Sequence, residues 1–436
     1  STLAKHGFGD VIQEMKLDRF VERGVSFVTA GHVAPEFERL PREVRLRKAM
    51  EELGPTFVKM GQVLATRPDL IPPEWAEEFR SLQDDVPQVE FSEIEKRLDE
   101  EFGDERRKIL KSVEKKALAA ASMAQVHRAV LKDGTHVVLK VLRPGIQEQT
   151  ETDMEIMHTL AGWAERSFSN MGYSPTEVVN EFARELAKDR PGDSRVWLRL
   201  ARLLQHPRHN EEVLAALDRV VTLDPRSVEA HDLRAERLAD MGRFDDALAA
   251  AKPSQLLSPE LPILLQGRAA WIEAQRGNYA AAIPPMQALV SVDPKYVWGW
   301  HQLAEWYNET GRPEGYLEAA SELARLQPGH PVALTMRGEA KIQTGDRDGG
   351  KADLRDALKV SAGYSPAAAV LFDAHLEDEE HREARQVLAV LQEHLAGPEV
   401  AVKQLQYACK TNDTDGAVQA FTEICEGPGQ TPFPIQ

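Results

Sequence analysis

From about residue 185 onward, hydrophobic residues recur every three or four positions, which is the spacing of one face of an α-helix. Single prolines and glycines interrupt this pattern at a fixed interval. Five prolines lie 34, 34, 35 and 34 residues apart: Pro191, Pro225, Pro259, Pro294 and Pro328. Four glycines lie 35, 34 and 34 residues apart: Gly242, Gly277, Gly311 and Gly345. Such a period predicts helix–turn–helix units that stack on one another.

Residues 297–328 show the unit most clearly. Four of their residues share one stripe of the first helix: Trp300, Leu303, Ala304 and Tyr307. The first unit has an equivalent stripe: Trp197, Leu200, Ala201 and Leu204. Small residues recur at one position of the second helices: Ala247, Ala282 and Ala384. We interpret both sets as packing positions, because they lie at helical spacing and because close helix contact needs small side chains.

The period and the stripe resemble those of tetratricopeptide repeat (TPR) proteins. This resemblance implies a mostly α protein in which an α-solenoid of about seven units covers residues 185–427, and it implies that a protein or peptide binds in a groove. The last two units lack the prolines, and residues 428–436 are expected to form a flexible tail. The groove candidates are offset from the packing stripe: Arg195, Arg202, Trp271, Trp298 and His301.

Residues 1–184 show no such period. Helices are predicted over residues 8–23, 41–65, 74–82, 92–111 and 149–167, and strands over 113–119, 124–132 and 136–142. The last two strands are joined by Asp133-Gly134, a pair typical of tight hairpins. We therefore predict a helical extension over residues 1–112 and, over 113–184, a partial α+β lobe with a three-stranded antiparallel sheet.

This lobe contains a kinase-like motif in which alanines replace glycines. Ala119, Ala121 and Ala124 stand where the G-x-G-x-x-G loop of a kinase has its glycines, and Val126 completes the pattern. Lys140 closes "VVLK" on the predicted third strand, where a kinase lysine meets the nucleotide phosphates. An alanine Cβ stiffens such a loop, so nucleotide contacts should differ from those of a glycine loop.

Four blocks, "LAKHGFGDVI", "LGPTFVKMGQVLATRPDLIP", "AAASMAQVHRA" and "VVLKVLRPGI", together resemble the UbiB-like (ADCK/aarF-type) atypical kinases linked to ubiquinone biosynthesis. The resemblance implies a K-x-G-Q helix, here containing Gly61, that folds over a pocket for ATP or ADP with Mg²⁺. It also implies an alanine-rich loop in that pocket. The nucleotide candidates are Lys59, Gln62, Ala119, Ala120, Ala121, Ser122 and Lys140.

The later parts of a kinase have no counterpart in the sequence. No His is followed two residues later by Asp, and D-F-G does not occur, although these motifs supply the base and the Mg²⁺ ligands. Glu148, Glu151 and Glu155 are equal candidates for the glutamate that pairs with the kinase lysine. We therefore assign no catalytic residue, and we expect that the chain alone is not an enzyme.

Composition narrows the remaining choices. A net charge of −17 argues against a general nucleic-acid binder, and no apolar run is long enough for a membrane span, although peripheral membrane contact stays open. The two cysteines, Cys409 and Cys425, are too few for a multi-cysteine metal site and are expected to be small buried residues. No metal ligand is assigned, and we expect a cytoplasmic location.

Three interpretations follow. The first is a TPR protein-interaction scaffold fused to a UbiB-like nucleotide-binding remnant, with a link to ubiquinone biosynthesis. The second is a UbiB-like atypical kinase or ATPase that acts in quinone biosynthesis. The third is a fusion or an assembly mosaic whose two halves have no joint function. The missing catalytic motifs favour the first over the second.

Overall fold

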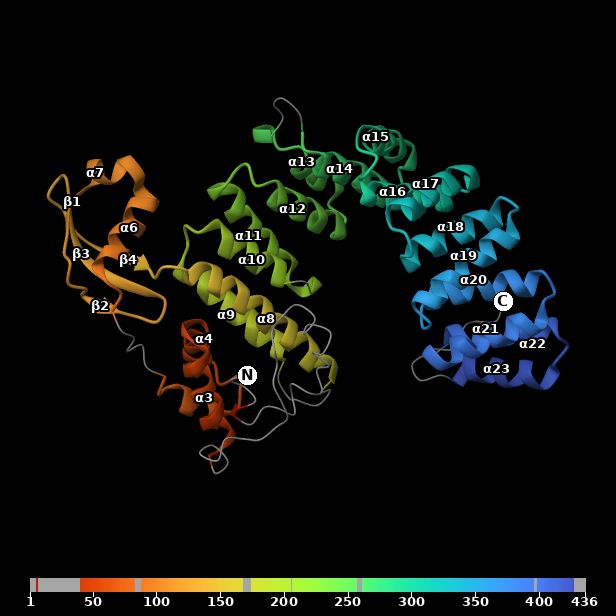
Figure 1. Cartoon of the computed structure of the whole chain (residues 1–436), viewed down its shortest axis with the longest axis horizontal. Helices are drawn as coiled ribbons and strands as arrows, with labels where there is room; N and C mark the ends of the chain where they lie inside the picture. Colours follow the sequence, from red (N-terminus) through yellow and green to blue (C-terminus); the bar gives the residue numbers. More distant parts are fainter. Residues whose placement is uncertain are drawn as a thin grey trace. The chain divides into compact units, whose positions relative to one another are not determined.

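The computed structural model describes residues 5–6, 40–82, 88–167, 174–204, 206–256, 261–395 and 398–426. The chain divides into two compact units, Ser1–Leu223 and Asp224–Gln436. Figure 1 shows that the described part is mostly helical with one small sheet, which confirms the predicted fold class. The helix predicted over residues 8–23 and the tail predicted over 428–436 lie outside the described residues.

The first unit contains the sheet and the kinase-like segment. Its elements are α3 (Arg42–Leu53), α4 (Pro55–Ala65), α5 (Pro73–Phe79), α6 (Phe91–Phe102), η2 (Gly103–Glu105), α7 (Arg106–Ile109), β1 (Leu110–Val113), β2 (Ala119–Ala120), β3 (Ala124–Leu131), β4 (His136–Leu142), α8 (Ile146–Ser167), α9 (Pro175–Asp189), α10 (Ser194–Leu203), η3 (Pro207–His209) and α11 (Asn210–Leu223). The helix predicted over 41–65 is two helices, because Gly54 breaks it with φ 115°. The helix predicted over 92–111 ends where Gly103 takes φ 50°.

The antiparallel sheet has four strands rather than the predicted three. β3 is central and pairs with β1, β2 and β4. The segment predicted as one strand over 113–119 is divided between the end of β1 and the start of the two-residue β2. One face packs against α6, where Ile94, Leu98 and Val141 are buried. The opposite face is open to solvent, as the 61% exposure of Val138 shows.

The second unit consists of paired helices. These are α12 (Val228–Asp240), α13 (Phe244–Ala251), the turn η4 (Ser254–Leu256), α14 (Ile263–Gln275), α15 (Tyr279–Val292), α16 (Val297–Glu309), α17 (Pro313–Leu326), α18 (Pro331–Gln343), α19 (Arg347–Val360), α20 (Ser365–Glu377), α21 (His381–His394), α22 (Pro398–Lys410) and α23 (Thr414–Glu426). Together with α10 and α11, the described helices form the seven predicted pairs.

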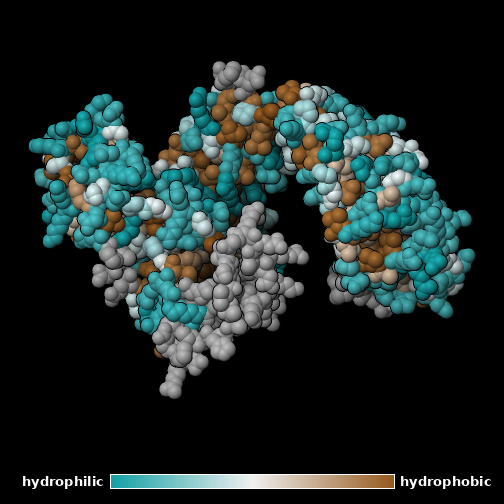
Figure 2. Space-filling model, viewed as in Figure 1, coloured by the Kyte–Doolittle hydropathy of each residue, from teal (hydrophilic) through white to brown (hydrophobic). Residues whose placement is uncertain are grey.

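Most of the predicted packing positions are buried, whereas Trp197 and Trp300 are half-buried. Leu303 and Ala304 of the clearest unit are 1% and 0% exposed, and the small residues Ala247, Ala282 and Ala384 are all 0% exposed. A helix pair can approach closely at these alanines, since a larger side chain would need space that the neighbouring helix occupies. Figure 2 shows hydrophobic surface near α13, the shortest of the described second helices.

Three of the prolines that mark the period are in contact with a side chain of the first helix that follows them. Three ring nitrogens lie at hydrogen-bond distance from proline carbonyl oxygens: Trp197 Nε1 from Pro191 (3.2 Å), His231 Nε2 from Pro225 (3.1 Å) and Trp300 Nε1 from Pro294 (3.1 Å). The tryptophan of the stripe therefore has a polar function beside its packing function. It joins its own helix to the turn that precedes the unit.

The turn inside each of the six pairs from α12 to α23 requires a left-handed backbone. The four glycines of the period have φ of 73°, 81°, 64° and 98°. Glu379 (φ 62°) and Asn412 (φ 55°) occupy the equivalent turns of the last two pairs. The same hydrogen bond closes these turns, for example from Glu380 N to the His375 carbonyl at 2.9 Å. The last two units thus keep the turn without its glycine.

The C-terminal end is less buried than predicted. Cys409 and Cys425 are both exposed, which contradicts the expectation that they are small core residues. Val418 and Phe421 of α23 are 62% and 56% exposed.

We predict that Glu379→Gly raises the free energy of unfolding by about 1 kcal/mol, because glycine adopts positive φ without the steric penalty of a Cβ. Urea denaturation followed by circular dichroism measures the change. Gly345→Ala is the matched control and should lower stability by a similar amount. Equal stability of Glu379→Gly and the parent chain would show that this turn relaxes without strain.

Candidate functional site

The centre of the candidate site is an arginine held between two tryptophans in the second unit. The Arg268 guanidinium on α14 lies 4.8 Å from the ring centre of Trp271 and 5.5 Å from that of Trp298 on α16. Arg268 is only 8% exposed. It donates two hydrogen bonds to the Asp232 carboxylate, at 2.8 and 3.0 Å, and one to Glu236 at 3.3 Å. These contacts fix both rings before any partner arrives.

The electrostatics keep this arginine charged. Burial by itself would lower the pKa of Arg268, but the hydrogen bonds and charges of Asp232 and Glu236 raise it overall. Burial, together with the charge of Asp232, raises the pKa of Tyr296 to about 12. The Tyr296 hydroxyl is buried and has no hydrogen-bond partner within the described part of the chain. A Cβ on Gly267 would lie 2.4 Å from that hydroxyl, so only glycine fits there.

The structure brings two of the five predicted groove residues together. Trp271 and Trp298 share Arg268, and His301 lies on the same helix as Trp298, with its Nδ1 3.6 Å from Glu305. Arg195 and Arg202 are on α10 in the first unit. Sequence reasoning missed Arg268 and Tyr296. The available signal was an arginine three residues before Trp271 on the same helix.

Three glutamates of the same unit lie close along the chain of repeats: Glu305 and Glu309 are on α16, and Glu339 is on α18. Tyr279 donates its hydroxyl hydrogen to Glu309, and Tyr316 donates to Glu339 at 2.8 Å. Burial and the charges of Glu339 and Glu305 raise the pKa of Tyr316. Among the described residues, no lysine or arginine forms an ion pair with these three glutamates. Their negative charge is therefore available to a partner.

The nucleotide candidates lie in the first unit, and the sheet joins some of them. Ala119 is opposite Val126, and Val126 is opposite Lys140, so the three side chains share one face of the sheet. Lys140 is exposed on this open face. No ion pair of Lys140 with a described residue is seen, and in particular none with Glu148 or Glu155.

The alanine loop is a tight turn. Ala120 pairs with Gln125 across β2 and β3, and the Ala121 N–H donates to the Ala124 carbonyl at 2.8 Å. The Ala121 carbonyl accepts a hydrogen bond from Arg143 at 3.1 Å. Ser122 is 3% exposed. The amide of Ala121 is therefore used inside the turn rather than presented to a phosphate.

The K-x-G-Q residues contact helices and a loop. Lys59 Nζ lies 3.0 Å from a carboxylate oxygen of Asp189 on α9, and Gln62 donates to the Leu82 carbonyl at 3.4 Å. A Cβ on Gly61 would lie 2.2 Å from Leu82 Cδ1 and 3.0 Å from Met50 Sδ, so a larger residue would require these side chains to move. α4 packs against α3, α5, α8 and α9. In this chain the motif thus helps to fasten α4 to α9.

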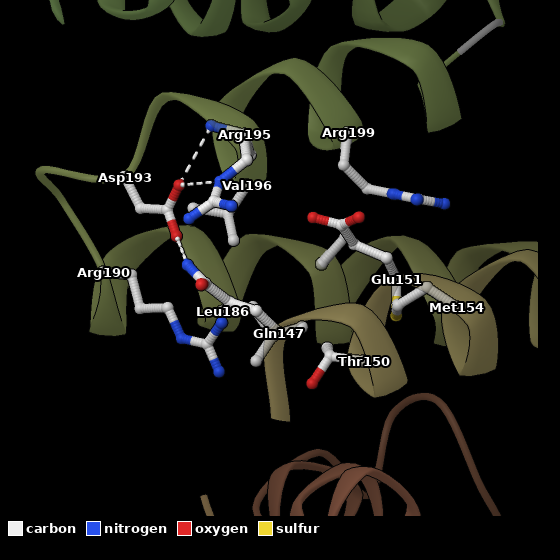
Figure 3. Close-up of a pocket in the computed structure, with 11 residues that line it drawn as sticks. Gln147, Thr150, Glu151, Met154, Leu186, Arg190, Asp193, Arg195, Val196 and Arg199 are labelled. Carbon is white, nitrogen blue, oxygen red and sulfur yellow. Dashed lines mark hydrogen bonds and ion pairs between the residues drawn. The ribbon is translucent and has the colours of Figure 1, made fainter. Parts of the chain in front are cut away.

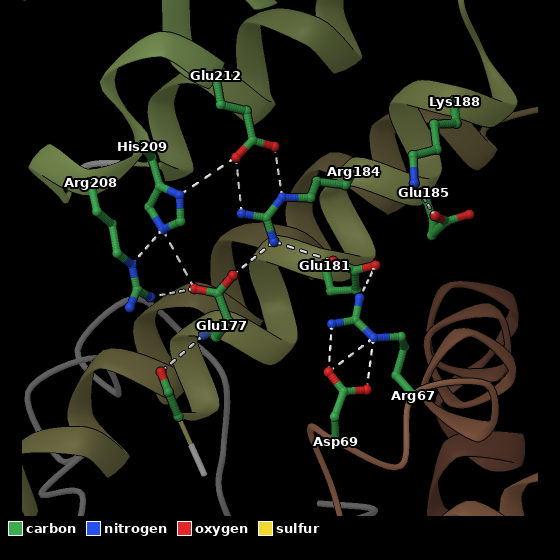
Figure 4. A network of polar contacts seen from close by, with 11 residues as sticks. Arg67, Asp69, Glu177, Glu181, Arg184, Glu185, Lys188, Arg208, His209 and Glu212 are labelled. Atoms are coloured by element: carbon green, nitrogen blue, oxygen red, sulfur yellow. Dashed lines mark hydrogen bonds and ion pairs between the residues drawn. The ribbon is translucent and has the colours of Figure 1, made fainter.

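A polar network continues along α9 (Figure 4). Arg184 donates to Glu177 at 2.8 Å, to Glu181 at 3.2 Å and to Glu212 of α11 at 2.7 Å. Burial alone would lower the pKa of Arg184, yet the Glu212 and Glu177 hydrogen bonds raise it. Arg67, which follows α4, forms an ion pair with Glu181. One helix face thereby connects the K-x-G-Q helix to the first repeat pair.

Residues 81–190 match the family model of the ABC1 atypical kinase-like domain. The chain is 41% identical over 145 residues to the "Probable protein kinase UbiB" of Cellvibrio japonicus, covering 33% of this chain and 26% of that protein. It is 36% identical over 191 residues to the UbiB protein of Glaesserella parasuis, covering 42% and 34%. The chain thus spans about a quarter to a third of these relatives. The predicted resemblance of the N-terminal part to UbiB-like kinases is confirmed.

Solved TPR proteins resemble the remaining part. PilW, a type IV pilus biogenesis factor, is 15% identical with a TM-score of 0.39, covering 50% of this chain and 98% of that chain. A TPR protein of Cytophaga hutchinsonii is 16% identical with a TM-score of 0.41, covering 54% and 96%. The assignment of the repeats to helix pairs rests on the period and the packing described above.

No helix of the described residues is long and apolar enough to cross a bilayer. We also find no group of three or more His, Cys, Asp or Glu side chains placed to hold a metal ion in that part of the chain.

We predict that Tyr296→Phe raises the free energy of unfolding by about 1 kcal/mol, because it removes a buried hydroxyl that lacks a partner. Tyr316→Phe is the matched comparison. It should lower stability by about 2 kcal/mol, because that hydroxyl bonds to a carboxylate. Urea denaturation of both variants measures the difference, and a loss of stability in Tyr296→Phe would reveal a hydrogen bond to this hydroxyl.

Proposed function

We propose that the repeat part of this chain binds a segment of another protein on the face formed by α14 and α16. The observation that supports this proposal is Arg268 held between Trp271 and Trp298. Tryptophan and arginine are the residues most enriched among binding hot spots. Here the arginine is already fixed by a carboxylate, so little side-chain entropy would be lost on binding.

Charge indicates the chemistry of the partner. Glu305, Glu309 and Glu339 accept hydrogen bonds from the neutral side chains of Gln302, Tyr279 and Tyr316, so these carboxylates attract cations. From residue 224 onward, Asp and Glu also outnumber Lys and Arg. A basic segment with at least one aromatic or aliphatic anchor fits this surface best. The rings would take the anchor, and the carboxylates would take the lysines or arginines.

Nucleotide binding by the kinase-like part is a second candidate function. It is favoured by the open sheet face on which Ala119, Val126 and Lys140 lie together. A lysine there can hold a phosphate as a point charge. A cytoplasmic location and the link to ubiquinone biosynthesis that UbiB resemblance implies stay predictions alongside it.

The groove is tested with basic peptides selected from a display library against the whole chain. We predict that Trp298→Ala weakens the selected peptide by about 2 kcal/mol, roughly 30-fold in Kd, as expected for an aromatic hot spot. Fluorescence anisotropy of the labelled peptide measures Kd. Val292→Ala, 78% exposed on α15, is the control and should leave Kd unchanged. Equal Kd for Trp298→Ala and the parent chain would move the binding site elsewhere.

The nucleotide face is tested by calorimetry with ATP, with and without Mg²⁺. We predict that Lys140→Ala weakens ATP binding about tenfold by removing the phosphate contact, whereas Lys111→Ala on β1 does not.

Radiolabelled ATP with a generic protein acceptor should give no phosphoryl transfer, because H-x-D and D-F-G are absent from the sequence. Transfer that Lys140→Ala abolishes would mean that other acidic residues complete a catalytic site.

A further inference from the structure

A groove of about 970 Å³ lies between α13, α14 and α15 in the second unit. Many of the side chains that line it are apolar, among them Leu248, Ile263, Ala270, Leu289 and Val292. Figure 2 shows hydrophobic surface over this part of the repeat array. The volume is that of a binding cleft rather than of a packing defect.

The hollow between α8, α9 and α10 in the first unit is much smaller (Figure 3). It has room for about one water molecule, with a volume of about 20 Å³. The arginines beside it already interact with carboxylates, as Arg195 does with Asp193 at 3.2 Å. We therefore assign no ligand to it.

The groove of the second unit exists in part because α13 ends early. α13 has eight residues, whereas the second helices α11, α15, α17, α19 and α21 each have 14. Pro253 ends the helix, because proline has no N–H and disfavours helical backbone at the residue before it. Beside α14, the array thus lacks a piece of helix about 9 Å long, at 1.5 Å per residue.

The packing stripe of α14 also lacks its large side chains. Three of its members are smaller than their equivalents 34 residues later in α16: Gln266 for Trp300, Ala269 for Leu303 and Glu273 for Tyr307. Trp300 packs against the buried cluster that contains Leu323 of α17. The equivalent of Leu323 on α15 is Leu289, which lines the groove. The Gln266 side chain donates to the Leu261 carbonyl at 2.5 Å, so it does not fill the space that the indole occupies in the next pair.

The end of the groove near the Gly277 turn carries hydrogen-bond acceptors. Glu273 and Ala281 lie four residues before and after this glycine, and both line the groove. Pro285 has no N–H, so the Ala281 carbonyl lacks the donor that a regular α-helix supplies. Glu273 accepts a hydrogen bond from the neutral Asn278 side chain at 2.9 Å, which leaves its charge in place. This end therefore favours a basic group.

We propose that this groove binds an amphipathic helix of a partner protein, which places an aromatic side chain beside Gln266 and a lysine or arginine beside Glu273. A helix fits because helices of the chain itself occupy the corresponding space in the other pairs, and helix-in-groove binding uses an apolar face in this way. The exposed Lys252 on the α13 wall would pair with an acidic residue of the same helix. Gln266 and Glu273 are seven residues apart, so the aromatic and basic residues of the partner should be about two turns apart.

This site is separate from the face formed by α14 and α16. Gln266 and Arg268 are two residues apart, so they point to different sides of α14. The proposal therefore does not depend on binding beside Trp271 and Trp298.

The experiment selects amphipathic helical peptides from a display library against the full chain and measures Kd by fluorescence anisotropy. Val292→Asp should weaken the selected peptides about tenfold or more, because it places a charge in the apolar end of the groove. Val292 is 78% exposed, so the variant should fold. Val360→Asp is the matched control, because Val360 ends α19 at the equivalent position 68 residues later and is 61% exposed. It should leave Kd unchanged.

A second variant tests the missing indole. Gln266→Trp restores the residue that α16 has at this position, so it should exclude the aromatic anchor and weaken binding by a similar factor. Circular dichroism checks that the variant is folded. Trp298→Ala should leave the Kd of these peptides unchanged, which distinguishes this site from the α14–α16 face.

Four results would overturn the proposal. A library without binders would do so, as would peptides that bind the Val292→Asp and Val360→Asp chains equally well. A dimer in sedimentation that Val292→Asp abolishes would assign the groove to a second copy of the chain. Peptide binding that appears only after removal of residues 428–436 would assign the groove to the chain's own tail.

Discussion

Helix α9 is the constraint on which the first unit depends, because it packs against α4, α8 and α10 at once. Phe182 and Ala187 are both 0% exposed, and Arg184 holds carboxylates from its own helix and from α11. The kinase-like family match ends at residue 190, directly after this helix. A single element thus closes the kinase-like part and presents a hydrophobic face to the first repeat helix. The two parts of the sequence therefore meet inside one packed core rather than across a linker.

The period of the repeats could be predicted because every unit must bury an apolar helix face. The same hydrophobic pattern therefore recurs in the sequence once per unit. Seven helix pairs and their alanine contacts follow from it. The turns at Glu379 and Asn412 could not be predicted from a glycine pattern, because the backbone there keeps positive φ without glycine. Arg268 was missed for a related reason. An arginine in an apolar stripe looks unfavourable until Asp232, 36 residues away, is seen to neutralise it.

In the kinase-like part, the spacing of the motif predicted the hairpin. It did not predict which hydrogen bonds and ion pairs the motif residues form. Ala119 and Lys140 do share a face, as a loop and strand of this spacing would require. The Ala121 amide donates a hydrogen bond inside the turn, and Lys59 forms an ion pair with Asp189. Both contacts depend on which groups come close in space. Such choices follow from packing between distant segments, which a local pattern does not encode. The first strand was misplaced because β1 begins directly after the short α7.

The left-handed turns without glycine also bear on how the array opens. In a stack of repeats, stability is roughly a sum of each unit and its contacts with its neighbours. The last two pairs hold Glu379 at positive φ and leave Phe421 of α23 more than half exposed. Their amide hydrogens should then exchange with solvent through partial opening, whereas those around Leu303 exchange only when most of the unit unfolds. The repeat array would thus have a graded stability that falls toward its C-terminal end.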